Sequence, residues 1–232
     1  MIDCGISPNI ATFSSMIDIL CKERKIGKPF DLLELMTRKG VKPNVFTYNS
    51  LIQGLFHSGQ WKEATSLFNR MMSEGVNPDV VTFSSLINAL CKERRNEKAI
   101  TMLELMIQRD LTPDIVTYNS LIHGLCTSGQ WAEATSLFSR MMNEEINPDV
   151  VTFNSLIDAL CKEKRTEEAI TMLELMIQRD LKPNIVTYSS LILGLCNLGQ
   201  WAEATSFLGK MVDEDIIPNV VTFNILLGAV SK

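Results

Sequence analysis

The chain has 232 residues, of which 46% are hydrophobic and 21% are charged, and its formal net charge is −5. No stretch approaches the roughly 18 uninterrupted apolar residues of a membrane-spanning helix, and the first residues lack a secretory signal and the Arg- and Ser-rich composition of a transit peptide. The negative charge argues mildly against a nucleic-acid-binding protein, because such domains are usually basic. The apolar content is sufficient to bury a large hydrophobic surface.

An internal repeat of 35 residues organises the sequence. The segment VFTYNSLI at 45–52 returns as VVTFSSLI at 80–87 and as IVTYNSLI at 115–122. A fixed period of this length is typical of a solenoid, in which each repeat buries its apolar face against its neighbours. We therefore expect one array over residues 1–232, with a partial repeat at 1–9, complete repeats at 10–44, 45–79, 80–114, 115–149, 150–184 and 185–219, and a partial repeat at 220–232. Because both ends fall within a repeat, we expect the sequence to be a piece of a longer array or a truncated gene product.

The second repeat indicates how each repeat folds. Apolar residues three and four positions apart predict a first helix over about 47–57 and a second helix over about 61–74. Gly59 lies in the predicted turn between them, and Gly75 lies where a glycine commonly ends a helix. Since no strand pattern is present, we predict an all-α fold of stacked helix–turn–helix repeats.

Five of the six cysteines share position 12 of their repeats. They are Cys21, Cys91, Cys126, Cys161 and Cys196, and Phe56 holds the same position in the second repeat. A position that accepts Cys or Phe is expected in the apolar core. With no Cys-x-x-Cys pair and no nearby His cluster, we predict no bound metal and a reducing compartment. Trp61, Trp131 and Trp201 begin second helices in alternate repeats, and we expect them to pack in the core or between repeats.

The repeats carry the motifs VTYNSLI, GLC, GQWxEA and a closing Pro-Asp or Pro-Asn. With these motifs and its period, the sequence resembles the pentatricopeptide repeat (PPR) family over essentially its whole length. A tetratricopeptide array would instead have a period of about 34 residues. The uniform spacing resembles the P-class of the PPR family, and the GQW and LCKE segments are similar to its plant restorer-of-fertility-like branch.

This resemblance implies a right-handed α-solenoid (superhelix) that binds single-stranded RNA, with one base recognised by each repeat. It implies an organellar protein, mitochondrial in preference to chloroplast, that acts in RNA processing, stabilisation or translational control. Protein partners in that process are left open. No cofactor, small-molecule substrate or membrane is implied.

The resemblance also assigns roles to individual residues. In the family, positions 5 and 35 of each repeat recognise the base and position 2 sandwiches it. Carried over to this sequence, the base-recognising pairs are Ser14 with Asn44, Asn49 with Asp79, Ser84 with Asp114, Asn119 with Asp149, Asn154 with Asn184 and Ser189 with Asn219. The sandwiching residues are Phe46, Val81, Val116, Val151, Val186 and Val221, while Ala11 offers little surface in the first repeat. At position 13, Lys22, Lys92 and Lys162 are expected to contact phosphate, or else to belong to a solvated turn of mixed charge.

By the same resemblance, the six pairs favour the order 5′-AUGU(C/U)A-3′. The chemistry of the side chains agrees with this order, because an ionised Asp only accepts hydrogen bonds whereas Asn both donates and accepts. Position 5 is always Ser or Asn and position 35 is always Asn or Asp in the six complete repeats, while the neighbouring Thr is constant. Lysines on an inner surface and acidic residues on the second helices would reconcile the net charge with an anionic ligand.

Purely structural roles for these residues compete with RNA recognition. The position 35 residue is a good helix N-cap, and the position 5 residue could be an ordinary polar residue of an exposed helix. We predict no enzymatic activity, because neither His57 nor His123 belongs to the His-x-Glu signature of zinc deaminases and no Ser/His/Asp set is present. The main alternative function is a helical-repeat scaffold that binds protein partners without RNA specificity.

Overall fold

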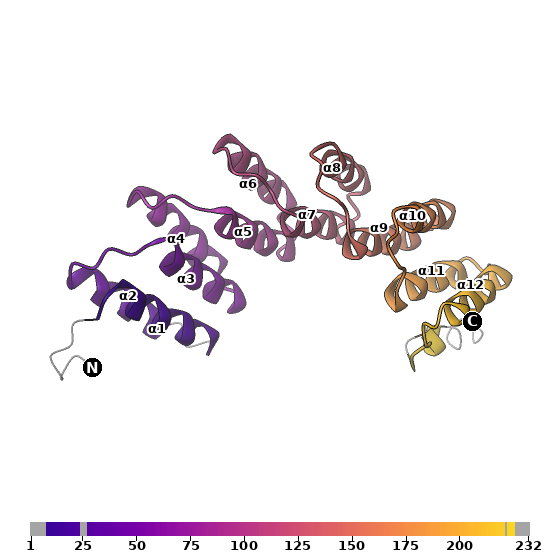
Figure 1. Ribbon diagram of the computed structural model, residues 1–232, viewed down its shortest axis with the longest axis horizontal. Helices are drawn as coiled ribbons and strands as arrows, with labels where there is room; N and C mark the ends of the chain where they lie inside the picture. The colour runs from indigo at the N-terminus through magenta and orange to yellow at the C-terminus, as the bar shows by residue number, and fades with distance from the viewer. Residues whose placement is uncertain (1–7, 24–26, 221, 226–232) are drawn as a thin grey trace. The chain divides into compact units, whose positions relative to one another are not determined.

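The structure, a computed structural model, describes residues 8–23, 27–220 and 222–225, and every regular element within these residues is an α-helix (Figure 1). Two helices fall in each 35-residue repeat. The first helices are α1 (Ile10–Lys22), α3 (Val45–His57), α5 (Val80–Lys92), α7 (Ile115–Thr127), α9 (Val150–Lys162) and α11 (Ile185–Asn197). The second helices are α2 (Gly27–Arg38), α4 (Trp61–Ser73), α6 (Asn96–Gln108), α8 (Trp131–Asn143), α10 (Thr166–Gln178) and α12 (Trp201–Asp213).

Each first helix begins where a polar side chain can cap it. The first turn of a helix has backbone N–H groups without a partner inside the helix, and the side chain of the preceding residue can accept from one of them. Asp79 does this for α5, because its Oδ1 accepts from the backbone N–H of Thr82 at 2.9 Å, and the Thr82 hydroxyl completes a capping box. Since position 35 supplies this cap, α3 begins at Val45, two residues before the predicted start.

The second helices end in a left-handed residue. In the second repeat this residue is Gly75, with φ of +74°. The following N–H of Val76 bonds to the carbonyl of Met71 at 3.0 Å, which is the long hydrogen bond of a Schellman motif. As a result α4 ends at Ser73, one residue before the predicted end. The later repeats place non-glycine residues in the same conformation, namely Asp110, Glu145, Asp180 and Asp215.

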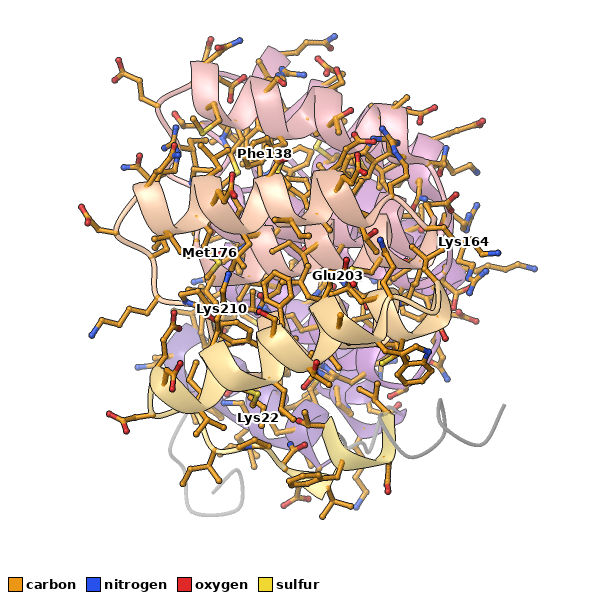
Figure 2. The ribbon with its side chains drawn as sticks, turned by 90° about the vertical axis from the view of Figure 1, so that its right-hand side faces the viewer. Lys22, Phe138, Lys164, Met176, Glu203 and Lys210 are labelled. Atoms are coloured by element: carbon orange, nitrogen blue, oxygen red, sulfur yellow. The ribbon has the colours of Figure 1, made fainter. Side chains whose placement is uncertain are left out.

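The chain divides into two compact units within α7, after Thr117. In the N-terminal unit, α3 packs against both α1 and α5, and each of these first helices packs against its own second helix. The C-terminal unit repeats this arrangement, with α9 packed against α11 and each paired with its second helix. Figure 2 shows α8, α10 and α12 in a row, with Met176 labelled on α10 and Glu203 and Lys210 on α12.

Aromatic residues fill the space between consecutive repeats. In the N-terminal unit, the rings of Phe68 on α4 and Phe83 on α5 meet edge to face, with centroids 5.7 Å apart. Phe138 and Phe153 form the same contact in the C-terminal unit. Tyr48 is fully buried and its hydroxyl donates to Glu74 Oε2 at 2.5 Å, so the Tyr side chain ties the start of one helix to the end of its partner.

The five cysteines that the structure describes pack as apolar residues, to different depths. Cys21, Cys91, Cys161 and Cys196 are buried, whereas Cys126 is only partly buried. Burial raises the pKa of the Cys161 thiol to about 12, with a smaller contribution from Asp158, so the thiol stays protonated and unreactive at neutral pH. Within the described residues, no group of His, Cys, Asp or Glu is arranged to hold a metal ion.

The tryptophans lie outside the core. Trp61 and Trp131 are partly buried and Trp201 is 37% exposed. Their exposure follows from their position, because each tryptophan begins a second helix directly after the turn between the two helices of its repeat. Trp61 contacts the ring of Phe56 in its own repeat at 5.3 Å between centroids, whereas Trp131 lies beneath the guanidinium of Arg165 in the next repeat, at 5.2 Å. Of the two expected locations, the contact between repeats therefore holds for Trp131.

None of the helices in the described part of the chain is long and apolar enough to cross a bilayer.

Candidate nucleic-acid interface

The predicted sandwiching residues leave about half of their surface exposed. Phe46 is 51% exposed, and the four described valines at the same position are 50–55% exposed. They are Val81, Val116, Val151 and Val186; Ala11 is also exposed, and Val221 lies outside the described residues. All the described ones are the second residue of a first helix. An apolar side chain held this way on a regular helix can contact a flat ligand with little loss of conformational entropy.

Three of the predicted base-recognising pairs contact each other directly. In the second repeat, the amide Nδ2 of Asn49 donates to Asp79 Oδ1 at 3.0 Å. The corresponding distances are 3.1 Å for Asn119 with Asp149 and 3.2 Å for Asn154 with Asn184. Positions 5 and 35, which are 30 residues apart in sequence, are therefore adjacent in all three repeats that have Asn at position 5.

The three pairs with Ser at position 5 are joined through a threonine instead. The hydroxyl of Ser14 lies 2.6 Å from the hydroxyl of Thr47, which in turn donates to Asn44 Oδ1 at 2.9 Å. Thr117 links Ser84 to Asp114 in the same way, at 2.7 Å on each side. Thr222 links Ser189 to Asn219 over longer distances of 3.2 and 3.3 Å. The Ser side chain is too short to bond to position 35 directly, so the threonine hydroxyl links the two residues.

The threonine at position 3 belongs to the site, although the sequence pattern alone did not assign it there. From the second repeat onward these residues are fully buried, and they are Thr47, Thr82, Thr117, Thr152, Thr187 and Thr222. Where position 5 is Asn, the threonine hydroxyl donates to the Asn carbonyl oxygen at 2.6 Å, as Thr82 does to Asn49. Its constancy across repeats was the available signal.

Capping and pairing use the same atom of position 35. Asp79 Oδ1 accepts from the backbone N–H of Thr82 and from the amide of Asn49, and the Thr82 hydroxyl oxygen lies 2.8 Å from it. The pKa of Asp79 is lowered: burial alone would raise it, but the hydrogen bonds from Asn49 and Thr82 outweigh the cost of desolvation. The pKa of Asp149 is lowered in the same way, because the hydrogen bonds from Thr152 and Asn119 outweigh burial. Both carboxylates are therefore ionised at neutral pH.

The position 5 side chains present less surface than the prediction assumed. Ser14 is only 3% exposed, and Asn49 and Ser84 are each 8% exposed. The members of the C-terminal unit, Asn119, Asn154 and Ser189, are partly buried. Position 35 is more accessible, because Asn44, Asp114 and Asn219 are exposed and Asp79, Asp149 and Asn184 are partly buried. A ligand would therefore meet mainly the position 35 side chain and the exposed residue at position 2.

The predicted phosphate-binding lysines are exposed but differ in their surroundings. Lys22 donates to Asp18 at 2.7 Å and Lys162 donates to Asp158 at 2.6 Å. Lys92 has no ion pair or hydrogen bond to any residue that the structure describes. Other acidic residues lie on or directly after the second helices: Glu63, Glu133 and Glu203 belong to their first turns, and Glu74, Glu144 and Glu214 directly follow them.

These features define an α-helical repeat protein in which each first helix carries a paired polar group beside an exposed apolar side chain. The model of the PPR repeat family matches residues 8–57, 43–92, 78–127, 113–162, 148–197 and 183–232. The chain belongs to the PPR repeat family. No curated protein matches the chain.

Solved PPR structures share the fold. The maize protein PPR10 superposes with a TM-score of 0.74 at 24% identity, over 98% of this chain and 37% of PPR10. PPR10 in complex with an 18-nt psaJ RNA element gives a TM-score of 0.62 at 23% identity, over 96% of this chain and 36% of that one. The PPR domain of Arabidopsis thaliana protein-only RNase P 1, solved in complex with tRNA, gives 0.67 at 18% identity, over 77% of this chain and 94% of that domain.

The likeness confirms the predicted fold class of stacked helix–turn–helix repeats. This chain spans 37% of the length of PPR10. At these identities the comparison shows the fold alone.

Proposed function

We propose that this PPR array binds single-stranded RNA, one base to each repeat, with a preference for 5′-AUGU(C/U)A-3′. RNA is present in the solved complexes of PPR10 and of the protein-only RNase P 1 domain. The observation that carries the proposal for this chain is the engagement of Oδ1 of position 35 in capping the next helix, which is the same in all six repeats.

The cap determines what position 35 can offer to a base. Because Oδ1 is committed to the helix, the other terminal atom of the side chain is the one available for recognition. That atom is Nδ2 in Asn, which donates, and Oδ2 in Asp, which accepts when ionised. Bases with an accepting ring nitrogen, adenine and cytosine, therefore suit Asn44, Asn184 and Asn219. Bases with a ring N–H, guanine and uracil, suit Asp79, Asp114 and Asp149.

Position 5 separates the bases within each class. The shorter Ser occupies repeats 1, 3 and 6, for which purines are proposed, and the longer Asn occupies repeats 2, 4 and 5, for which pyrimidines are proposed. A small pyrimidine needs a longer side chain to reach its edge. Asn49 donates one amide hydrogen to Asp79, and its second hydrogen can donate to a uracil carbonyl while Asp79 Oδ2 accepts from the uracil ring N–H. Asn154 with Asn184 supplies two donors, which suit the ring nitrogen and carbonyl of cytosine.

The exposed residues at position 2 and the lysines at position 13 complete the proposed binding surface. Half-exposed valines fit between successive bases, where an apolar contact with the base face does not depend on its identity. Lys22, Lys92 and Lys162 are the candidates for phosphate contact. Binding by such a surface needs no catalytic group, and the proposed role of these residues is to bind RNA without cleaving it.

Order-dependent binding tests the proposal. Fluorescence anisotropy should give tighter binding to a short RNA containing AUGUCA than to a strand with the same six bases in scrambled order. Each mismatched base is expected to cost on the order of 1–3 kcal/mol. Equal affinity for both strands would overturn the base assignments. Binding to neither strand would overturn RNA recognition and favour the protein-binding scaffold.

The biological role that we propose follows the sequence resemblance to P-class proteins of the restorer-of-fertility-like branch. The protein would act on a mitochondrial transcript in processing, stabilisation or translational control. Sequencing of RNA that copurifies with the protein from isolated mitochondria tests this role. The expected result is enrichment of transcripts that contain the AUGU(C/U)A order, and a failure to recover any such enrichment would contradict it.

A further inference from the structure

The three lysines at position 13 each follow a polar residue one helical turn earlier, at position 9. In α1 and α9 this residue is an aspartate, Asp18 and Asp158, whereas in α5 it is Asn88. Residues four apart lie on the same face of a helix, so position 9 side chains are within reach of the lysines. Glu follows each lysine directly in all three repeats, so that residue cannot account for a difference among them.

Two of the three lysines are neutralised by this neighbour. The Lys22 ammonium lies 2.7 Å from Asp18 Oδ2, and the Lys162 ammonium lies 2.6 Å from Asp158 Oδ2. The neighbouring repeat holds each aspartate as well, because Ser50 donates to Asp18 Oδ1 at 3.3 Å and Ser190 donates to Asp158 Oδ1 at 3.5 Å. Both carboxylates are therefore fixed beside their lysines.

Lys92 lies in a different environment. It lines a cavity of about 590 Å³ near the C-terminal ends of α3 and α5, together with Gln53, His57, Trp61 and Asn88. No Asp or Glu is among the described residues that line this cavity. The corresponding cavity beside Lys22, of about 260 Å³, includes Asp18 in its lining.

The charge balance decides which lysine can attract a phosphate. An exposed ion pair between residues four apart is weak, so a phosphate could displace the lysine from its aspartate. Displacement does not remove the carboxylate, which stays within a few ångströms of the phosphate and repels it. A Lys–Asp pair thus carries no net charge toward RNA, whereas Lys92 beside the neutral Asn88 carries a full positive charge.

We propose that Asp18 and Asp158 weaken RNA binding by neutralising Lys22 and Lys162, so that Lys92 is the position 13 lysine that binds the RNA backbone. This inference rests on the proposed function. On this inference the residue at position 9 determines how many phosphates the array neutralises. This role is separate from base recognition by positions 5 and 35.

Matched variants of the whole chain test this. Asp158→Asn keeps an oxygen for Ser190 and removes the charge, Asn88→Asp introduces the charge beside Lys92, and Asp213→Asn removes the same charge from the exposed end of α12 as a control. Affinity for an AUGUCA-containing strand is measured by anisotropy over a range of salt concentrations, with circular dichroism to establish that each variant is folded.

Asp158→Asn is expected to tighten binding about threefold to fourfold at low salt, the size expected for removing a unit charge about 5–7 Å from a phosphate in water. The slope of log affinity against log salt should steepen by about 0.7, the value for one more phosphate contact on a single strand. Asn88→Asp should produce the opposite changes, and Asp213→Asn should match the wild type.

Two results would overturn the inference. If Asp158→Asn behaves as the Asp213→Asn control does, or binds RNA more weakly than the wild type, the carboxylate does not oppose binding. Such a result leaves the proposed function standing, since the wild type still binds. If the wild type binds no single-stranded RNA, the proposed function fails and the inference fails with it.

Discussion

Replacing Thr82 by Val tests whether one buried hydroxyl both stabilises the fold and holds the base-recognising residue Asn49 in place. Thr82 is fully buried, and its hydroxyl lies 2.6 Å from Asn49 Oδ1 and 2.8 Å from Asp79 Oδ1. Valine has nearly the same shape, so the substitution removes the hydroxyl without opening a cavity. The backbone N–H of residue 82 can still donate to Asp79, so α5 keeps this half of its capping box, while the backbone N–H of Asp79 loses the Thr82 hydroxyl oxygen.

The expected cost follows from the group that loses its partner. Asn49 is 8% exposed, and the Thr82 hydroxyl is the hydrogen-bond partner of its Oδ1 among the described residues. An unpaired buried acceptor costs about 1–3 kcal/mol. We expect Thr82→Val to lower the free energy of unfolding by that amount, and to weaken discrimination at the second base because Asn49 is no longer held in place.

Urea denaturation followed by circular dichroism measures the first effect, with Thr65→Val as the matched control. The Thr65 hydroxyl bonds to the carbonyl of Trp61 on the exposed side of α4, where water can replace it. The control should change stability by no more than about 0.5 kcal/mol. If Thr82→Val is as mild as the control, the buried hydroxyl is not a structural part of the pair.

Three further predictions concern stability. Gly194→Ala should destabilise the protein by about 1–3 kcal/mol, because the new Cβ would lie 2.7 Å from Cys161 Cβ, whereas Gly209→Ala, with nothing within 4 Å, should stabilise it by about 0.5–1 kcal/mol. Glu145→Gly should stabilise by up to about 1 kcal/mol, because φ of +59° costs Glu more than Gly. The pKa of Asp79 is lowered on folding, so its contribution is complete above its ordinary pKa of about 4 and is lost as pH falls through the folded value; Asp79→Asn should reduce this loss of stability in acid.

Each of these predictions has a distinct contradicting outcome in urea or acid titrations. Equal effects of the two glycine substitutions would mean that the close contact with Cys161 is relieved without cost. A less stable Glu145→Gly variant would mean that backbone entropy outweighs the left-handed conformation. An unchanged acid transition in Asp79→Asn would mean that this carboxylate is not linked to folding.

The fold was largely predictable because the repeat constrains it at every step. The pattern of the second repeat predicted the bounds of its two helices to within two residues. The errors at Val45 and Glu74 have a physical origin, since hydrophobic spacing does not indicate where capping side chains and left-handed residues begin and end a helix. The core location that we expected as one alternative for the tryptophans was wrong. Apolar character alone does not distinguish a residue beside a turn from a residue of the buried core.

The candidate site was only partly predictable. The family resemblance placed positions 5 and 35 in pairs, but the side-chain contacts depend on length, and only the Asn residues reach directly. The burial of Ser14 and its hydrogen bond to Thr47 could not be predicted from the sequence. The spacing of polar residues does not indicate which of two polar side chains is buried. The sequence shows that Lys22 follows Asp18 whereas Lys92 follows Asn88. Only the structure shows that Asp18 forms an ion pair with Lys22.

The most direct test of the central claim, that the position 35 side chain specifies the base, is an exchange measured at the third repeat. Binding of the wild type and of Asp114→Asn is compared on two RNAs that differ only at the third base, AUGUCA and AUAUCA. We predict that the wild type prefers guanine and that the variant prefers adenine, with each mismatch costing about 1–3 kcal/mol, since Asn retains the cap while its outward atom becomes a donor. An unchanged preference in the variant would contradict the claim.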